Sequence, residues 1–345
     1  MKKTLKAAVA LSVLAAPAYA ANLENPLYMP KQNEMYSKTS VGIMYKVADD
    51  STAHVNKGHD GATEFPIWRL HEDLGYGITD RLEAYAKIGY THDDDIARKG
   101  MHQGRVGLKY RAFETTDGFA WDIYADAHLG GVSGMTGSYA ADGFTYDNYS
   151  NGRWGFHAGT QVGKTWSRFT GAAFFEVLQT FGNDNNEIDV TGYKLPAALG
   201  ALAGQPVTVL GLPDEISVDL KSTTEFNAGL KTFYQIDDRW SVGAGFTFKH
   251  HEDNGVEGLA SDLKTMPTPQ LQGAQKAVVD TLLATVKDMN DGFDEYIISL
   301  SGSYQLTDAT QVTLYGEYTF DDAHQMSQNG TDVKAEIGAR VNVVF

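Results

Sequence analysis

Apolar and polar residues alternate along this chain with the period of a β-strand that has one dry and one wet face. In residues 332–345, apolar side chains occupy every second position from Val333 to Phe345, and Lys334, Glu336 and Arg340 lie on the opposite face. Twelve segments show this pattern. Their lengths suit tilted strands that cross a membrane, which need about 9–11 residues. The segments lie near residues 35–47, 64–78, 81–92, 102–113, 119–131, 153–166, 168–181, 222–236, 239–250, 293–306, 310–321 and 332–345.

The connections between these segments alternate between short and long. The short connections, such as 79–80, 115–118 and 237–238, contain Asp, Thr and Gly, which favour tight turns. The long connections lie near 48–63, 93–101, 132–152, 182–221, 251–292 and 322–331. An antiparallel barrel with tight turns at one end and long loops at the other produces this rhythm.

Alternating strands also occur in secreted β-sandwiches, but their loops are short at both ends. Here the loops are long on one side only. Aromatic residues such as Trp68, Tyr76 and Trp121 gather near segment ends, where membrane interfaces favour them. We therefore predict an all-β fold, a transmembrane antiparallel up-and-down β-barrel of about 12 strands. One long extracellular loop is expected to carry a short amphipathic helix.

The sequence resembles bacterial outer-membrane β-barrel proteins of the porin-like kind. The residues that carry the resemblance are 18–20, strand–turn–strand units such as 76–82, and the last strand ending at Phe345. The resemblance covers residues 34–345 and does not distinguish a subfamily. It implies that Phe345 is the signal read by the barrel-assembly machinery, and that outer-membrane lipid and lipopolysaccharide are partners. Twelve-stranded relatives include channels for nucleosides and acidic oligosaccharides, and a phospholipase.

The first twenty residues predict a secretory signal peptide. A basic start, with Lys2, Lys3 and Lys6, precedes an apolar stretch over 7–17 and the small-x-small site 18–20. The apolar stretch is too short for a membrane anchor, which needs about 20 residues. We expect a signal peptide at 1–20, a periplasmic N-terminal segment at 21–33 and an outer-membrane barrel at 34–345. An even number of strands returns both chain ends to the periplasmic side.

Composition excludes several functions. The formal net charge is -16, and loss of the three lysines in 1–20 makes it more negative. Nucleic acid is therefore not an expected partner, because its phosphates attract basic surfaces. The absence of cysteine excludes disulfides and cysteine-ligated metals.

If the apolar faces contact lipid, the opposite faces line the interior. The predicted pore-lining residues carry both signs of charge and include two histidines: Arg69, Asp73, Glu83, Lys87, Arg105, Lys109, Arg111, Asp122, Asp126, His128, Arg153, His157, Glu176, Lys231, Glu317, Glu336 and Arg340. They form either a structural ladder of ion pairs or a charged constriction in a water-filled pore. Interior Gly and Ser residues leave space and favour a narrow pore.

The stripe of Arg105, Lys109 and Arg111 is the best candidate for attracting anions. Its pairing with Asp122 and Asp126 on the next strand is the favoured interpretation. The acidic long loops predict a weak preference for cations, which salt would screen.

The two longest loops differ from the others. Apolar residues recur at three- and four-residue spacing in 270–289, as at Ala274, Val278 and Leu282, and indicate an amphipathic helix. Residues 195–202 of the other loop are apolar. We expect the two loops to pack together as a lid or constriction. The alternatives are burial in the barrel mouth, contact with a partner, or no stable helix.

No cofactor is predicted. Seven of the ten histidines lie in or beside the long loops, and several adjoin Asp or Glu: His54, His59, His92, His102, His250, His251 and His324. Imidazole with carboxylate suits Zn, Cu or Ni, but no recognised ligand spacing is present. Solvated acidic loops, with divalent cations bridging to lipopolysaccharide, are the preferred interpretation.

The sequence does not predict an enzyme. The G-x-S-x-G motif is absent. Asp126, His128 and His157 share the interior without an obvious serine partner, which favours a hydrogen-bonded network.

We predict a channel in the bacterial outer membrane through which small polar solutes diffuse. The first alternative is a non-conducting structural or adhesive barrel. The second is a hydrolase acting on lipid or peptide at the barrel rim.

Overall fold

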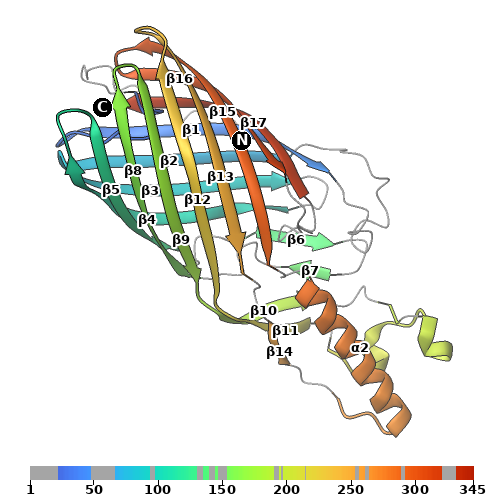
Figure 1. Cartoon of the computed structure of the whole chain (residues 1–345). Coiled ribbons are helices and arrows are strands. Elements are labelled where there is room, and N and C mark those ends of the chain that lie inside the picture. Colours follow the sequence, from blue (N-terminus) through green and yellow to red (C-terminus); the bar gives the residue numbers. More distant parts are fainter. Residues whose placement is uncertain are drawn as a thin grey trace.

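The computed structural model describes residues 22–47, 67–93, 98–129, 135–139, 144–146, 154–189, 194–195, 197–213, 215–252, 256–260, 264–288, 292–320 and 332–345. Twelve antiparallel strands form a closed barrel (Figure 1). They are β1 (Met35–Val47), β2 (Ile67–Thr79), β3 (Leu82–Asp93), β4 (Arg98–Glu114), β5 (Phe119–His128), β8 (Gly155–Trp166), β9 (Phe169–Thr180), β12 (Thr223–Gln235), β13 (Trp240–His251), β15 (Phe293–Thr307), β16 (Thr310–Phe320) and β17 (Asp332–Val344). The predicted fold is confirmed.

Each barrel strand pairs with the one before and after it along the chain, and β17 pairs with β1 to close the barrel. The closing register places Tyr36 opposite Val344. The backbone N–H of Phe345 donates to the carbonyl of Met35 at 2.7 Å. The start of β1 and the end of β17 therefore meet at the end of the barrel that carries the tight turns. In outer-membrane barrels this end faces the periplasm.

The alternation of the sequence separates a lipid-facing surface from a polar interior. Outward apolar side chains are the exposed ones: Leu314, Leu300 and Ile337 are 66%, 63% and 62% accessible. Asp122 and Thr313, which face inward, are 0% accessible. Outward aromatic residues gather near both strand ends, with Trp121, Trp166 and Trp240 by the tight turns and Trp68, Trp154 and Tyr318 by the long loops. Apolar side chains on the outside and polar side chains on the inside are the reverse of a soluble protein, and they suit a hydrocarbon environment.

Beyond the long-loop end, five short strands form an extension in the order β6 (Met135–Tyr139), β7 (Phe144–Tyr146), β10 (Asn183–Asp189), β11 (Glu215–Leu220) and β14 (Val256–Ala260). The 3-10 helices η3 (Ala197–Leu202) and η4 (Val207–Leu210) lie in the connection between β10 and β11. No helix in the described part of the chain is long and apolar enough to cross a membrane.

The predicted loop helix is confirmed as α2 (Pro269–Asp288). Val278 and Leu282 on its apolar face are each 2% accessible, and Gln275 Nε2 donates to the carbonyl of Leu210 in η4 at 2.8 Å. Val207, also in η4, is completely buried. The two longest loops therefore pack together, as expected. Figure 1 shows α2 beyond the end of the barrel, beside β14.

Candidate functional site

The chain preceding β1 folds into the barrel at the tight-turn end. We call residues 22–30 the plug. Four of its backbone carbonyls accept hydrogen bonds from luminal side chains: Leu23 from Lys38 Nζ (2.9 Å), Pro26 from Gln161 Nε2 (2.6 Å), Leu27 from Arg111 Nη2 (2.6 Å) and Tyr28 from Lys109 Nζ (2.8 Å). The donors come from different sides of the barrel, so the plug spans its cross-section.

Polar side chains of the plug bind the remaining strands. Glu24 accepts hydrogen bonds from Arg340 Nη1 at 3.0 and 3.1 Å and from Asn342 Nδ2 at 2.8 Å. Asn22 and Asn25 contact the starts or ends of other strands: Asn22 contacts Gln235, Ser241 and Gln311, and Asn25 contacts Thr170. Most of the attachment is therefore polar.

Two leucines provide the apolar part of the attachment. Leu23, 2% accessible, packs on Tyr36 and Val344. Leu27, 7% accessible, packs against the small side chains of Ala120 and Ala172. Burying two such side chains contributes roughly 1.5–3 kcal/mol each.

Burial of Glu24 acts to raise the pKa of its carboxyl. The charges of Arg340 and Lys38 and the hydrogen bonds from Asn342 and Arg340 outweigh burial, so the pKa lies below its ordinary value of 4.5. Glu24 is therefore held as a carboxylate at neutral pH.

Sequence reasoning missed the plug. It assigned residues 21–33 to the periplasmic side, and the structure places residues 22–30 inside the barrel at that end. Residues 22–30 show neither a strand nor a helix period, so no pattern in the sequence indicated the plug. The expected signal peptide remains a prediction because residues 1–21 lie outside the described residues.

Above the plug, the lumen holds a cavity of about 530 Å³. Side chains of both charges line it, together with tyrosines and hydroxyls from most of the barrel strands. Among the predicted pore-lining residues it is lined by Asp73, Glu83, Lys87, Arg105, Lys109, Asp126, His157, Glu176, Lys231, Glu317 and Arg340. The structure therefore places these residues around one space. Arg153 lies outside the described residues.

Most charges on the β1–β8 wall are paired. Arg111 binds Asp122 through two hydrogen bonds, Nε at 2.8 Å and Nη2 at 3.2 Å, and Lys109 lies 3.6 Å from the same carboxylate. This is the predicted pairing for Lys109 and Arg111, whereas Arg105 has no hydrogen bond or ion pair among the described residues. Asp126 has a different partner: its Oδ2 lies 2.7 Å from His157 Nδ1.

Three further ion pairs cross the same wall or join it to β17. They are Lys87–Asp73 at 3.9 Å, Arg69–Glu336 at 3.2 Å and Lys109–Glu83 at 4.0 Å. Removing one partner of a largely buried pair such as Arg69–Glu336 or Lys109–Glu83 leaves an uncompensated charge. The wall is therefore a structural network.

Tyrosine–carboxylate hydrogen bonds complete the network, and sequence reasoning did not anticipate them. The donors and acceptors are Tyr36–Glu83 (2.5 Å), Tyr85–Asp126 (2.8 Å), Tyr124–Glu176 (2.6 Å) and Tyr315–Glu336 (2.7 Å). Each pair joins two different strands, so the bonds depend on register as well as residue type.

The His157–Asp126 pair resembles the orienting half of a catalytic triad, which also needs a nucleophile beside the imidazole. His157 Nε2 lies 3.6 Å from Glu176 Oε2, and Tyr124 packs on the imidazole at 5.7 Å between ring centroids. The hydrogen bonds and ion pairs of His157 in the described part of the chain join it to carboxylates alone, with no serine hydroxyl. The arrangement suits a structural network.

The β12–β16 wall differs from the rest of the lumen. Its inward positions carry small residues, among them Gly243, Gly245, Ser299 and Ser301. Lys231, on β12, lies beside these small residues, with its Nζ 4.5 Å from the centre of the Phe174 ring on β9. The cavity is therefore open on one side and crowded on the other.

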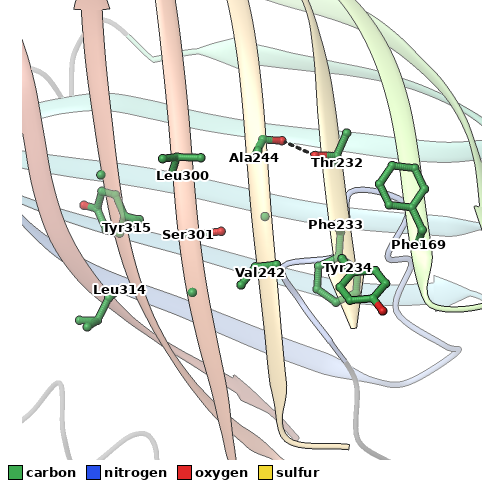
Figure 2. A pocket seen from close by; sticks show the side chains of 13 residues that line it. Phe169, Thr232, Phe233, Tyr234, Val242, Ala244, Leu300, Ser301, Leu314 and Tyr315 are labelled. Carbon is green, nitrogen blue, oxygen red and sulfur yellow. Dashed lines mark hydrogen bonds between the residues drawn. The ribbon is translucent and has the colours of Figure 1, made fainter. Parts of the chain in front are cut away.

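The outside of the same wall carries a shallow recess of about 500 Å³ (Figure 2). Leu300 and Leu314 lie beside it, and the hydroxyl of Thr232 donates to the carbonyl of Ala244 at 3.1 Å. Its rim is formed by lipid-facing side chains. We assign this recess to contact with lipid chains, and the luminal cavity is the candidate functional site.

Among the described residues, no group of three or more His, Cys, Asp or Glu side chains is placed to hold a metal ion. The side chains of His54, His59, His92, His102 and His324 lie outside that part of the chain. His250 and His251 contact Asp294 (2.6 Å) and Glu225 (3.4 Å). The divalent cations expected at the acidic loops remain a prediction.

No family model and no curated protein matches this sequence. The fold is similar to that of an outer-membrane channel from Pseudomonas putida F1, with a TM-score of 0.53, 11% identity, and coverage of 94% of this chain and 98% of that chain. The porin NanC gives a TM-score of 0.43 at 11% identity, covering 89% of this chain and 98% of that chain. The translocator domain of the autotransporter NalP from Neisseria meningitidis gives 0.41 at 8% identity, covering 100% and 94%.

These likenesses concern the fold. The chain has the fold of a bacterial outer-membrane β-barrel protein, in agreement with the predicted location in the bacterial outer membrane.

Proposed function

We propose that this protein is an outer-membrane channel for small polar solutes, closed at its periplasmic end by the plug. The observation that carries the proposal is the luminal cavity of about 530 Å³, lined by charged, hydroxyl and tyrosine side chains and floored by residues 23–26 and 28. A charged lining favours hydrated solutes over hydrocarbons, because a hydrocarbon in the cavity would displace water from these groups without replacing their hydrogen bonds.

The attachment of the plug supports a closure that can open. Hydrogen bonds to water replace those of a released polar segment, so each bond contributes only about 0.5–1.5 kcal/mol net. The apolar part consists of Leu23 and Leu27. A short segment with this balance can leave and return without unfolding the barrel.

The second candidate function is a non-conducting structural barrel. It is favoured by the contacts of the plug with strands all around the circumference, from Lys38 on β1 to Asn342 on β17. If these bonds never break together, the lumen stays closed.

Planar-bilayer recording separates the two functions. The full-length chain is compared with a variant that lacks residues 22–30 and is shown to be folded by circular dichroism and by its altered migration before boiling. We expect intermittent conductance steps from the full-length chain and a continuous open level from the deletion. A folded deletion variant that passes no current would support the non-conducting barrel.

A rim hydrolase is tested with the same preparations. Turnover of phospholipid or lipid A that disappears in His157→Ala would establish an enzyme in place of a channel.

A further inference from the structure

The open β12–β16 wall carries one basic and one acidic group in a single row. Lys231 on β12 is opposite Gly245 on β13, Gly245 is opposite Ser299 on β15, and Ser299 is opposite Glu317 on β16. Three strand spacings of roughly 4.8 Å place the Cα atoms of Lys231 and Glu317 about 14 Å apart along the wall. A glycine and a serine lie between them, so nothing bulky fills the gap.

Among the described residues, these two charged groups differ from most other charges of the lumen because they have no ion pair, a property they share with Arg105. Lys231 contacts the Phe174 ring, and within the described part of the chain it has no ion pair. The carboxylate of Glu317 has neither a hydrogen bond nor an ion pair within the same residues. Both side chains are exposed to the cavity.

The neighbours of Glu317 and Lys231 keep both groups available. Glu317 lies opposite Glu336 across the β16–β17 pair, and Glu336 already binds Arg69 and Tyr315. On β9, the strand paired with β12, the carboxylate of Glu176 accepts from Tyr124 and contacts His157. A cation near Glu317 and an anion near Lys231 would each meet an unsatisfied opposite charge.

The part of the wall between Lys231 and Glu317 offers hydrogen bonds to a solute. Ser299 and Ser301 face the cavity, and their hydroxyls make no hydrogen bond to another described residue. A Cβ at Gly245 would lie 2.5 Å from Ser299 Oγ, and one at Gly243 would lie 2.7 Å from Ser301 Oγ. The glycines therefore keep both hydroxyls accessible to a solute.

We propose that this row is a binding site for small zwitterions of the amino-acid class. The solute carboxylate would bind Lys231, its ammonium would bind Glu317, and the serine hydroxyls would bond the polar atoms between. A simple anion or cation would find its counter-charge at one end of the row and a like charge at the other. A zwitterion satisfies both ends. This inference rests on the proposed function only for its physiological use, because binding itself requires no passage.

Isothermal titration calorimetry on the full-length, detergent-folded protein tests the site. The probes are glycine and 4-aminobutyrate as zwitterions, and acetate and methylammonium as analogues with one charge. We expect at least one zwitterion to bind about tenfold more tightly than either analogue, because each charge-assisted hydrogen bond is worth a factor of that order.

Charge-neutral variants of similar shape locate the binding. Lys231→Met and Glu317→Gln should each weaken zwitterion binding by about tenfold. Lys164→Met removes a lysine that pairs with Asp117 at 2.6 Å beside a tight turn, and should leave binding unchanged. The exchange Lys231→Glu with Glu317→Lys should restore binding, because a zwitterion can bind in the reverse direction.

Equal affinity for zwitterions and single-charge analogues, or binding insensitive to both neutral variants, would overturn the inference. Loss of binding in the exchange variant, with its fold intact, would also contradict it. The proposed channel is judged separately: a folded plug deletion that binds zwitterions but never conducts would overturn the channel and leave this site standing.

Discussion

The two walls of the lumen use the same kinds of residue for different purposes. On β3–β5 and β8, charged side chains are crowded and bound to one another, as in Arg111–Asp122 and His157–Asp126. On β12–β16, glycine and serine leave space, and Lys231 and Glu317 line it without an ion pair to any residue that the structure describes. Near-equal numbers of positive and negative side chains in the lumen therefore do not show which of them are paired. Pairing decides which charges hold the barrel together and which meet a solute.

The largest contrast is expected in stability. Arg111→Met should lower the free energy of unfolding by about 3–5 kcal/mol, because it leaves the buried carboxylate of Asp122 without its main partner. Lys231→Met should change it by less than about 1 kcal/mol, since this lysine faces water and has no ion pair among the described residues. Urea unfolding in lipid vesicles, followed by tryptophan fluorescence, measures both. Equal losses would show that the two walls do not differ.

The next contrast lies within the open wall and compares its two faces. Gly245→Leu, made in the plug-deleted chain, should reduce conductance severalfold, because the new side chain enters the cavity beside Ser299. Gly302→Leu is the matched control. It lies on the lipid-facing side, where a Cβ meets nothing within 4 Å, so conductance should stay the same. Planar-bilayer recording distinguishes them, and a block by the outward substitution would reverse our assignment of the faces.

The strands and the loop helix were predictable from the sequence, whereas the pairing of luminal charges was not. The strands were predictable because lipid and water impose alternation on each strand separately, and the twelve predicted segments match the barrel strands within a few residues. The α2 helix was predictable from its own periodicity. The pairing of charges required register: a bulge between Arg111 and Phe113 shifts β4 against β5, and Asp126 contacts His157 on β8 instead of the arginine stripe.

The plug was not predictable in this way. Its residues show no period, and most contacts that attach them to the barrel wall, such as that of Glu24 with Arg340, join distant parts of the chain. Lys231 and Glu317 were both predicted to face the lumen. That they share one open row followed only from the assembled barrel.

A smaller effect is expected from acid. The pKa of Glu24 in the folded protein lies below its ordinary value of 4.5, so the attraction to Arg340 is complete above that value and is lost as pH falls through the lower one. The open probability of the full-length channel should therefore rise as the pH falls below 4.5. Glu24→Gln should remove this dependence and open the channel more often at neutral pH. A channel that closes on acidification would contradict the role of Glu24.

The smallest effect is expected from the loop helix. Deletion of residues 264–288 should leave conductance nearly unchanged, because α2 packs on η4 and β14 beyond the barrel end. Recording of the deletion variant checks this. A larger open-channel conductance would show that the packed loops restrict entry, as expected of the lid or constriction that the sequence predicted.

The central claim is that movement of the plug opens the channel, and a reversible link between plug and wall tests it most directly. Asn25 Nδ2 donates to Thr170 Oγ1 at 3.2 Å, and the chain has no cysteine of its own. Asn25→Cys combined with Thr170→Cys therefore offers the only two thiols, to be joined by a short bifunctional thiol reagent that a reductant cleaves. The single variant Thr170→Cys controls for the reagent. We predict that the linked channel shows no conductance steps and that reduction restores the steps of the full-length chain. Identical conductance in the linked and reduced forms would contradict the account.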